Sequence, residues 1–134
     1  MDLHRYLTRV YSLITSRQEI DVERLFADET IPGREGTIEG RLRFWDGSLL
    51  EFIETLVVRG FLIVKTDYSY HYQDSADQPI FRYDNAPHHP EVATFPNHKH
   101  LFERQSRRET IVSSAPPHLH DVLREIDQNL YPDS

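Results

Sequence analysis

Histidine is concentrated in the C-terminal third of this 134-residue chain, where six of the eight histidines lie between His88 and His120. Histidine titrates closest to neutral pH, so it serves as a general acid, a general base or a metal ligand. His88 and His89 lie between Pro87 and Pro90, which restrict the backbone on both sides. Because this restriction lowers the entropy cost of holding a reactive geometry, the loop is a candidate active-site segment.

A second pair, His98 and His100, is separated by one residue, so both side chains point to the same face if the segment is a strand. With Glu103 they form the pattern H-x-H-x-x-E, and His88 or His89 would complete a nitrogen-rich set of metal ligands. The glycines that flank the H-x-H pair of cupin metal sites are absent here. A metal centre is therefore an alternative, and the leading prediction uses neither a metal nor another cofactor.

Tyrosines alternate with polar residues along the segment from Phe61 to Tyr72. If the following turn pairs His71 with Ile80, Tyr70 meets Phe81 in an aromatic face. The same register gathers the polar residues on the opposite face, which are Asp67, Ser69, His71, Arg82 and Asp84. Aromatic ladders are usually core, and the functional alternative is a platform on which Tyr70 stacks a base beside Arg82.

The formal net charge is 15 − 22 = −7, so the chain as a whole repels nucleic acid and any RNA site requires a local basic patch. Arg82, Lys99 and the run from Arg104 to Arg108 are the basic residues near the histidines in the sequence. No P-loop, dinucleotide fingerprint or G-x-S-x-G motif is present, which argues against nucleotide-driven and serine-hydrolase chemistry.

The elements that must position these residues follow from hydrophobic spacing. Apolar residues recur at helical intervals over residues 3–16 and 117–130. Between them, alternation and turn signals such as Asp46-Gly47 and Arg59-Gly60 predict a sheet of about five strands, the first with a bulge. The predicted strands start at Ile20 and then cover Thr37–Phe44, Leu49–Val58, Phe61–Tyr72 and Pro79–Asn85. Two further short strands at His98–Phe102 and Glu109–Ser113 are an option.

This order of elements predicts an α+β domain in which both helices pack on one face of an antiparallel meander. The length fits a single domain over residues 1–134. The absence of cysteine excludes a disulfide scaffold and thiolate metal sites, and no apolar run is long enough to span a membrane. The N-terminus lacks the pattern of a secretory signal, so we expect a cytoplasmic protein with no membrane contact.

Three motifs in a fixed order resemble the TumE family, whose members are small bacterial and archaeal toxins of type II toxin–antitoxin pairs. The motifs are Tyr68-Ser69-Tyr70-His71-Tyr72-Gln73-Asp74, Phe81-Arg82-Tyr83-Asp84-Asn85-Ala86-Pro87-His88-His89 and Thr94-Phe95-Pro96-Asn97-His98-Lys99-His100. The segments Gly40-Arg41-Leu42-Arg43-Phe44 and Asp46-Gly47-Ser48 also fit, whereas Tyr72 departs from the tryptophan that the family often carries. The resemblance implies a toxin with a cognate antitoxin, a small DNA-binding protein. It does not assign the chemistry of the toxin, and RNA cleavage is the common expectation for toxins of such pairs.

The leading hypothesis is therefore a metal-independent endoribonuclease. One histidine of the His88/His89 pair would activate a ribose 2′-hydroxyl, and one of the His98/His100 pair would protonate the leaving oxygen. Asp84 would orient a histidine, and Arg82, Lys99 and Tyr70 would bind the phosphate and a base. The hypothesis requires at least three of the histidines to converge with Asp84 or Arg82. Two alternatives stay open, which are a non-enzymatic protein-binding module, favoured by the negative charge, and a histidine-ligated metal protein.

Overall fold

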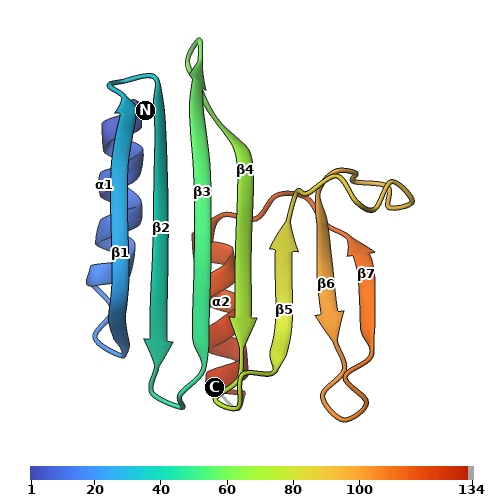
Figure 1. The fold of residues 1–134 in the computed structure, drawn as a ribbon. Coiled ribbons are helices and arrows are strands. Elements are labelled where there is room, and N and C mark those ends of the chain that lie inside the picture. Colours follow the sequence, from blue (N-terminus) through green and yellow to red (C-terminus); the bar gives the residue numbers. More distant parts are fainter. Residues whose placement is uncertain (133–134) are drawn as a thin grey trace.

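Within residues 1–132, which the structure describes, this computed structural model contains two helices and one seven-stranded sheet (Figure 1). The helices are α1 (Leu3–Thr15) and α2 (Leu119–Leu130). The strands are β1 (Ile20–Ile31), β2 (Glu35–Phe44), β3 (Leu49–Arg59), β4 (Leu62–Gln73), β5 (Pro79–Asp84), β6 (His98–Phe102) and β7 (Glu109–Ser113).

Every strand pairs antiparallel with the next one in the chain, so the sheet is a meander in the order β1 to β7. The predicted α+β class, the antiparallel meander and the two terminal helices are confirmed. The predicted number of five strands is too small, because the short segments His98–Phe102 and Glu109–Ser113 both join the ladder. The bulge predicted in the first strand lies between Val22 and Arg24.

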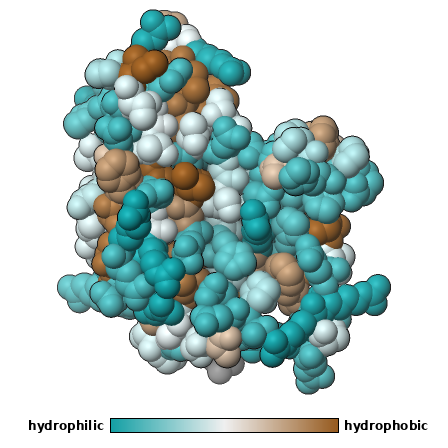
Figure 2. Space-filling model, in the orientation of Figure 1, coloured by the Kyte–Doolittle hydropathy of each residue, from teal (hydrophilic) through white to brown (hydrophobic). Residues whose placement is uncertain are grey.

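Both helices cover the same face of the sheet, and the opposite face carries no helix (Figure 1). Leu3, Leu7, Val10 and Ile14 bury one stripe of α1, which packs on β1 and β2. Asp2 caps this helix, since its side chain accepts a hydrogen bond from the Arg5 amide at 2.8 Å. We call the covered side of the sheet the helix face and the other side the open face, and hydrophilic residues occupy much of the open face (Figure 2).

The alternation predicted for β4 is present, and its tyrosines lie in the core on the helix face. The ladder between β4 and β5 is displaced by two residues from the predicted register, because Tyr70 faces Tyr83 and Tyr72 faces Phe81. Asp74 explains the displacement, since it closes a turn with Gln78 through hydrogen bonds in both directions before the strands pair. A shift of two residues leaves every side chain on its predicted face.

A carboxylate lies at the centre of the helix face, where Glu54 is completely buried. Tyr6 of α1 donates a hydrogen bond to it at 2.5 Å, and Tyr70 donates another. The Lys65 ammonium lies 3.8 Å from the same carboxylate and donates to the Tyr70 hydroxyl and to the Pro117 carbonyl. Burial raises the pKa of Tyr70, an effect that the Glu54 charge reinforces, and burial lowers the pKa of Lys65. This network joins α1, two central strands and the entry to α2.

Replacing Tyr70 by Phe is expected to lower the free energy of unfolding by about 1–3 kcal/mol, because a buried carboxylate and a buried ammonium each lose a partner. Chemical denaturation followed by circular dichroism measures this change. Tyr11→Phe is the matched control, since Tyr11 is exposed on α1 and its replacement should change stability by less than about 0.5 kcal/mol. Equal stability of the two variants would contradict the structural role given to the network.

Candidate functional site

The open face carries a cluster of one carboxylate and two imidazoles on neighbouring strands. The register places Asp84 of β5 opposite His98 of β6, and Arg82 opposite His100. Oδ1 of Asp84 lies 3.0 Å from Nε2 of His98, and Oδ2 lies 3.3 Å from Nε2 of His100. The two Nε2 atoms are themselves 3.0 Å apart. Two adjacent strands thus bring three polar groups to one point.

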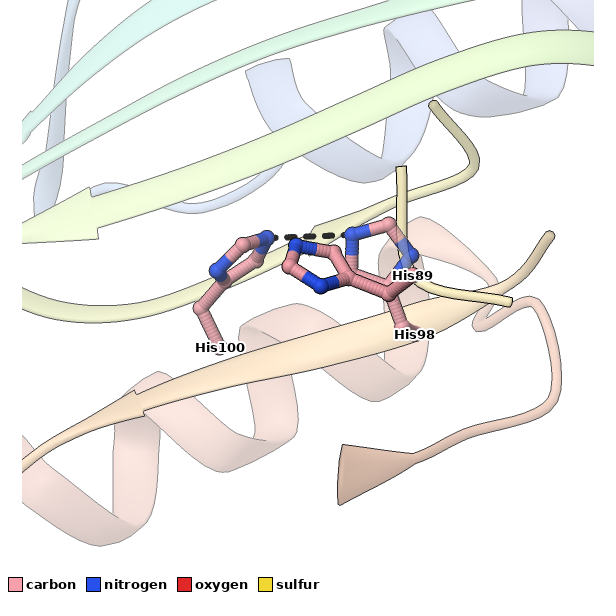
Figure 3. A group of neighbouring side chains, drawn as sticks. All are labelled: His89, His98 and His100. Carbon is pink, nitrogen blue, oxygen red and sulfur yellow. Dashed lines mark hydrogen bonds between the residues drawn. The ribbon is translucent and has the colours of Figure 1, made fainter. Parts of the chain in front are cut away.

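A third imidazole reaches this point from the loop between β5 and β6. The ring centroid of His89 lies 4.9 Å from that of His98 and 5.5 Å from that of His100 (Figure 3). One ring nitrogen from each of the three histidines lies within 4.8 Å of the others. We call Asp84, His89, His98 and His100 the histidine cluster. The predicted convergence of three histidines with Asp84 is therefore present.

Two asparagines attach the loop to the sheet. The Asn85 side chain accepts a hydrogen bond from the Tyr68 amide and donates one to the Thr66 carbonyl. The Asn97 side chain accepts from the Tyr68 hydroxyl at 2.9 Å. Sequence reasoning gave neither asparagine a role, although both lie inside the family motifs. Their contacts explain why the motifs of β4, β5 and the loop belong together, since all three meet at Tyr68.

Each histidine of the cluster uses its Nδ1 atom for a contact with an oxygen that accepts hydrogen bonds. His98 Nδ1 lies 2.8 Å from the Pro96 carbonyl, and His100 Nδ1 lies 2.6 Å from a carboxylate oxygen of Glu109. The third contact joins Nδ1 of His89 to a Glu91 carboxylate oxygen at 3.1 Å. A carbonyl or an ionised carboxylate only accepts, so each Nδ1 carries a hydrogen and donates it. In a neutral imidazole with this tautomer, Nε2 is left with a lone pair.

Asp84 is buried and its carboxylate is compensated by donors of its own strand and loop. The Ala86 amide donates to Oδ1 at 3.0 Å, and the Arg82 guanidinium forms an ion pair with Oδ2, with Nε at 3.0 Å. A buried charge requires such partners, because an unpaired carboxylate away from water costs several kcal/mol. These donors hold the carboxylate in the orientation that faces the two histidines of β6.

Two residues that the sequence suggested do not join the cluster. His88 is exposed beside His89, because the turn after Asp84 directs only one of the paired histidines toward β6. Glu103, the acidic member of the H-x-H-x-x-E pattern, lies in the exposed turn between β6 and β7. Glu109 takes its place at His100. Only the pairing of β6 with β7 brings Glu109 back beside His100, so the linear pattern could not identify it.

Two of the predicted RNA contacts lie on the wrong side of the sheet. Lys99 is between His98 and His100, so strand alternation turns it to the helix face, where it donates to Glu125 at 2.7 Å. Tyr70 is fully buried in the core and cannot stack on a base. Arg82 is the member of the predicted phosphate-binding set that lies on the open face, and its side chain is 46% exposed.

A groove of about 410 Å³ lies on the open face, and Arg82 belongs both to its lining and to the surroundings of the cluster. Further charged lining residues are Arg24, Arg41, Glu39 and Glu51. His71 also lines it and faces Arg82 across the ladder. Burial lowers the pKa of His71, and the positive charge of Arg82 adds to this effect.

The chain matches the family model described as Toxin TumE over residues 10–130. The chain belongs to the TumE toxin family. No curated protein and no solved structure matches the chain. Membership in TumE implies a toxin role and an antitoxin partner. In this TumE chain the matched region contains the complete sheet and the histidine cluster. No helix in the described part of the chain is long and apolar enough to cross a membrane.

Replacing Arg82 by Gln is expected to raise the pKa of His71, while burial still holds it below the ordinary value of 6.5. Proton NMR of the imidazole ring during a pH titration measures this shift. Because the unfolded chain protonates first, His71 makes the folded state lose stability as the pH falls below 6.5. Arg9→Gln on the exposed side of α1 is the control, and an equal response to both replacements would exclude a direct effect of Arg82.

Proposed function

We propose that this TumE chain is an endoribonuclease whose reacting groups are those of the histidine cluster. The single observation that carries the proposal is the convergence of Asp84 with three imidazoles on the open face. Imidazole and carboxylate groups held at one point are suited to proton transfer and to charge stabilisation at a phosphodiester. Membership in a toxin family makes RNA a reasonable substrate class, because arrest of growth requires an abundant and essential target.

Exposure separates the three histidines by role. The side chain of His98 is only 1% exposed, so it cannot touch a ribose and acts as a positioning residue. The His89 side chain is 28% exposed and that of His100 is 13% exposed. In the metal-independent scheme, His89 is therefore the candidate base for the 2′-hydroxyl and His100 the candidate acid for the leaving oxygen. The proposed scheme uses His89 and not the exposed His88 as the base.

The substrate phosphate would lie beside Arg82. This guanidinium is within hydrogen-bond reach of Asp84 and borders the groove, so a phosphate bound there would lie next to the cluster. Arg24 and Arg41 extend the positive lining across the sheet, although Glu39 and Glu51 oppose it. The mixture of charges predicts weak binding of long RNA and favours recognition of a short single-stranded segment at Arg82.

The antitoxin partner is proposed to be a small DNA-binding protein, as the family resemblance implies. In that case toxicity on expression of this chain alone should be relieved when the neighbouring antitoxin gene is expressed with it. A partner that covers the open face would block the cluster, whereas one that binds elsewhere would leave RNA cleavage in the purified complex intact. The two outcomes distinguish direct from indirect neutralisation.

RNA digestion by the purified chain tests the proposal. His100→Ala and His89→Ala are expected to lower the cleavage rate by about 100-fold or more, which is the usual contribution of a general acid or base. The His89 side chain is 28% exposed and that of His100 is 13% exposed, so thermal melting of both variants checks that they remain folded. Growth arrest on expression in cells provides a second measurement and should weaken in the same order.

His4→Ala is the matched control, because His4 lies on α1 with its side chain 80% exposed, away from the open face. It should retain full cleavage and full toxicity. If the wild type cleaves no RNA but remains toxic, the chain acts as a binding protein. If the two cluster variants cleave RNA as fast as His4→Ala, the histidine cluster is not the active site.

A further inference from the structure

The contact between His98 and His100 lacks a hydrogen when both imidazoles are neutral. Both Nδ1 atoms are occupied by donation to Pro96 and Glu109, so each Nε2 faces the other with a lone pair at 3.0 Å. The carboxylate of Asp84 adds acceptor oxygens at 3.0 and 3.3 Å from these atoms. Three electron-pair donors thus meet at one buried point. Such an arrangement is repulsive unless a cation lies among them.

One extra proton would remedy only part of this repulsion, because an imidazolium Nε2 carries a single hydrogen for two acceptors. A divalent metal ion accepts a lone pair from every donor at once. Metal–nitrogen bonds of roughly 2.0–2.1 Å place neighbouring ligand atoms about 2.8–3.0 Å apart in octahedral coordination and about 3.3–3.4 Å apart in tetrahedral coordination. The separations of 3.0 and 3.3 Å among these atoms fall in these ranges.

Each of the three histidines also has a hydrogen-bond acceptor at the ring nitrogen that would not bind the metal. Metal-bound histidines usually donate the other ring nitrogen to a carboxylate or a backbone carbonyl, which fixes the tautomer and the ring orientation. His98 has the Pro96 carbonyl in that position, His100 has Glu109, and His89 has Glu91. The Nε2 atoms of His98 and His100 therefore face Asp84, and a ring nitrogen of His89 lies within 4.8 Å of those of His98 and His100, so His89 would move closer when it joins the ligands.

We propose that Asp84, His89, His98 and His100 bind one divalent transition-metal ion. Three imidazole nitrogens and one carboxylate oxygen form the mixed set that suits Zn²⁺ and its neighbours Co²⁺ and Ni²⁺ better than Mg²⁺ or Ca²⁺. Asp84, His98 and His100 form a rigid part on two paired strands, and His89 closes the site from the loop. The proposal rests on the same site as the proposed ribonuclease and makes its cleavage metal-dependent instead of metal-independent.

Titration of the chelator-treated, full-length protein with Co²⁺ tests the proposal without RNA. The expected result is one Co²⁺ per chain with the visible absorption of a nitrogen- and oxygen-ligated ion, displaced by Zn²⁺. Zn²⁺ at about 100 times its dissociation constant should also stabilise the fold by about 2.7 kcal/mol, seen as a higher melting temperature. Unchanged absorption and melting temperature up to millimolar metal would overturn the proposal.

Two neighbouring histidines provide the matched variants. His89→Ala should weaken metal affinity by at least 10-fold, whereas His88→Ala changes an exposed residue one position away and should leave it unchanged. Asp84→Asn removes a ligand charge with little change of shape, and Glu109→Gln should weaken affinity about 10–100-fold by loosening His100. Equal losses for His88→Ala and His89→Ala would contradict the assignment, and these two loop positions keep the test valid if Asp84→Asn does not fold.

The experiments can reject the metal-site proposal and the ribonuclease proposal independently of each other. Metal binding without RNA cleavage removes the proposed function and leaves the metal site in place. RNA cleavage that resists chelator, in a protein that binds no Co²⁺ or Zn²⁺, removes the metal site and leaves the acid–base scheme of His89 and His100. Cleavage that is lost on chelation and restored by Zn²⁺ or Co²⁺, but not by Mg²⁺, supports both.

Discussion

Every side chain of the central strands must face one of two sides of a single sheet, and only one side is covered by helices. This constraint separates the residue types of the central strands between the two faces. Most tyrosine, leucine and phenylalanine side chains of β2 to β5 lie on the helix face, where they form one core with α1 and α2. Charged groups go to the open face, except where a network satisfies them. Glu54 is one such exception, since Tyr6, Tyr70 and Lys65 contact it, and Lys99 is another, since it pairs with Glu125 of α2.

The same division creates the histidine cluster. Asp84, His98 and His100 occupy open-face positions on two paired strands, so they meet without any help from the core. The aromatic ladder behind them makes the platform rigid, because side chains in a close-packed core occupy few rotamers. Tyr68 connects both sides, since its ring lies in the core while its hydroxyl and amide hold Asn97 and Asn85. The loop that carries His89 is thereby fixed to the sheet.

The cluster differs in its physical demands from an ordinary patch of surface histidines. Each ring has an acceptor at its Nδ1 atom, and the carboxylate of Asp84 is buried beside the Ala86 amide and the Arg82 guanidinium. Electron-pair donors that are already aligned need little rearrangement when a cation binds between them, so this arrangement favours cation binding. The electron-pair donors of the cluster suit a cation, whereas the neighbouring Arg82 guanidinium suits an anion such as a phosphate.

The sequence by itself determined the two helices, the core strands and the face of each residue in them, because helical and strand periodicities are local properties. The sequence also determined the face on which Lys99 lies. Lys99 was expected to be part of the site, but strand alternation between His98 and His100 places it on the helix face. Only the tertiary structure decided that Asp84 faces His98, that His89 and not His88 joins them, and that Glu109 replaces Glu103. Those choices depend on strand register, on the path of the loop and on a hairpin pairing, which are contacts between segments distant in the chain. The spacing of residues along the chain does not predict such long-range contacts.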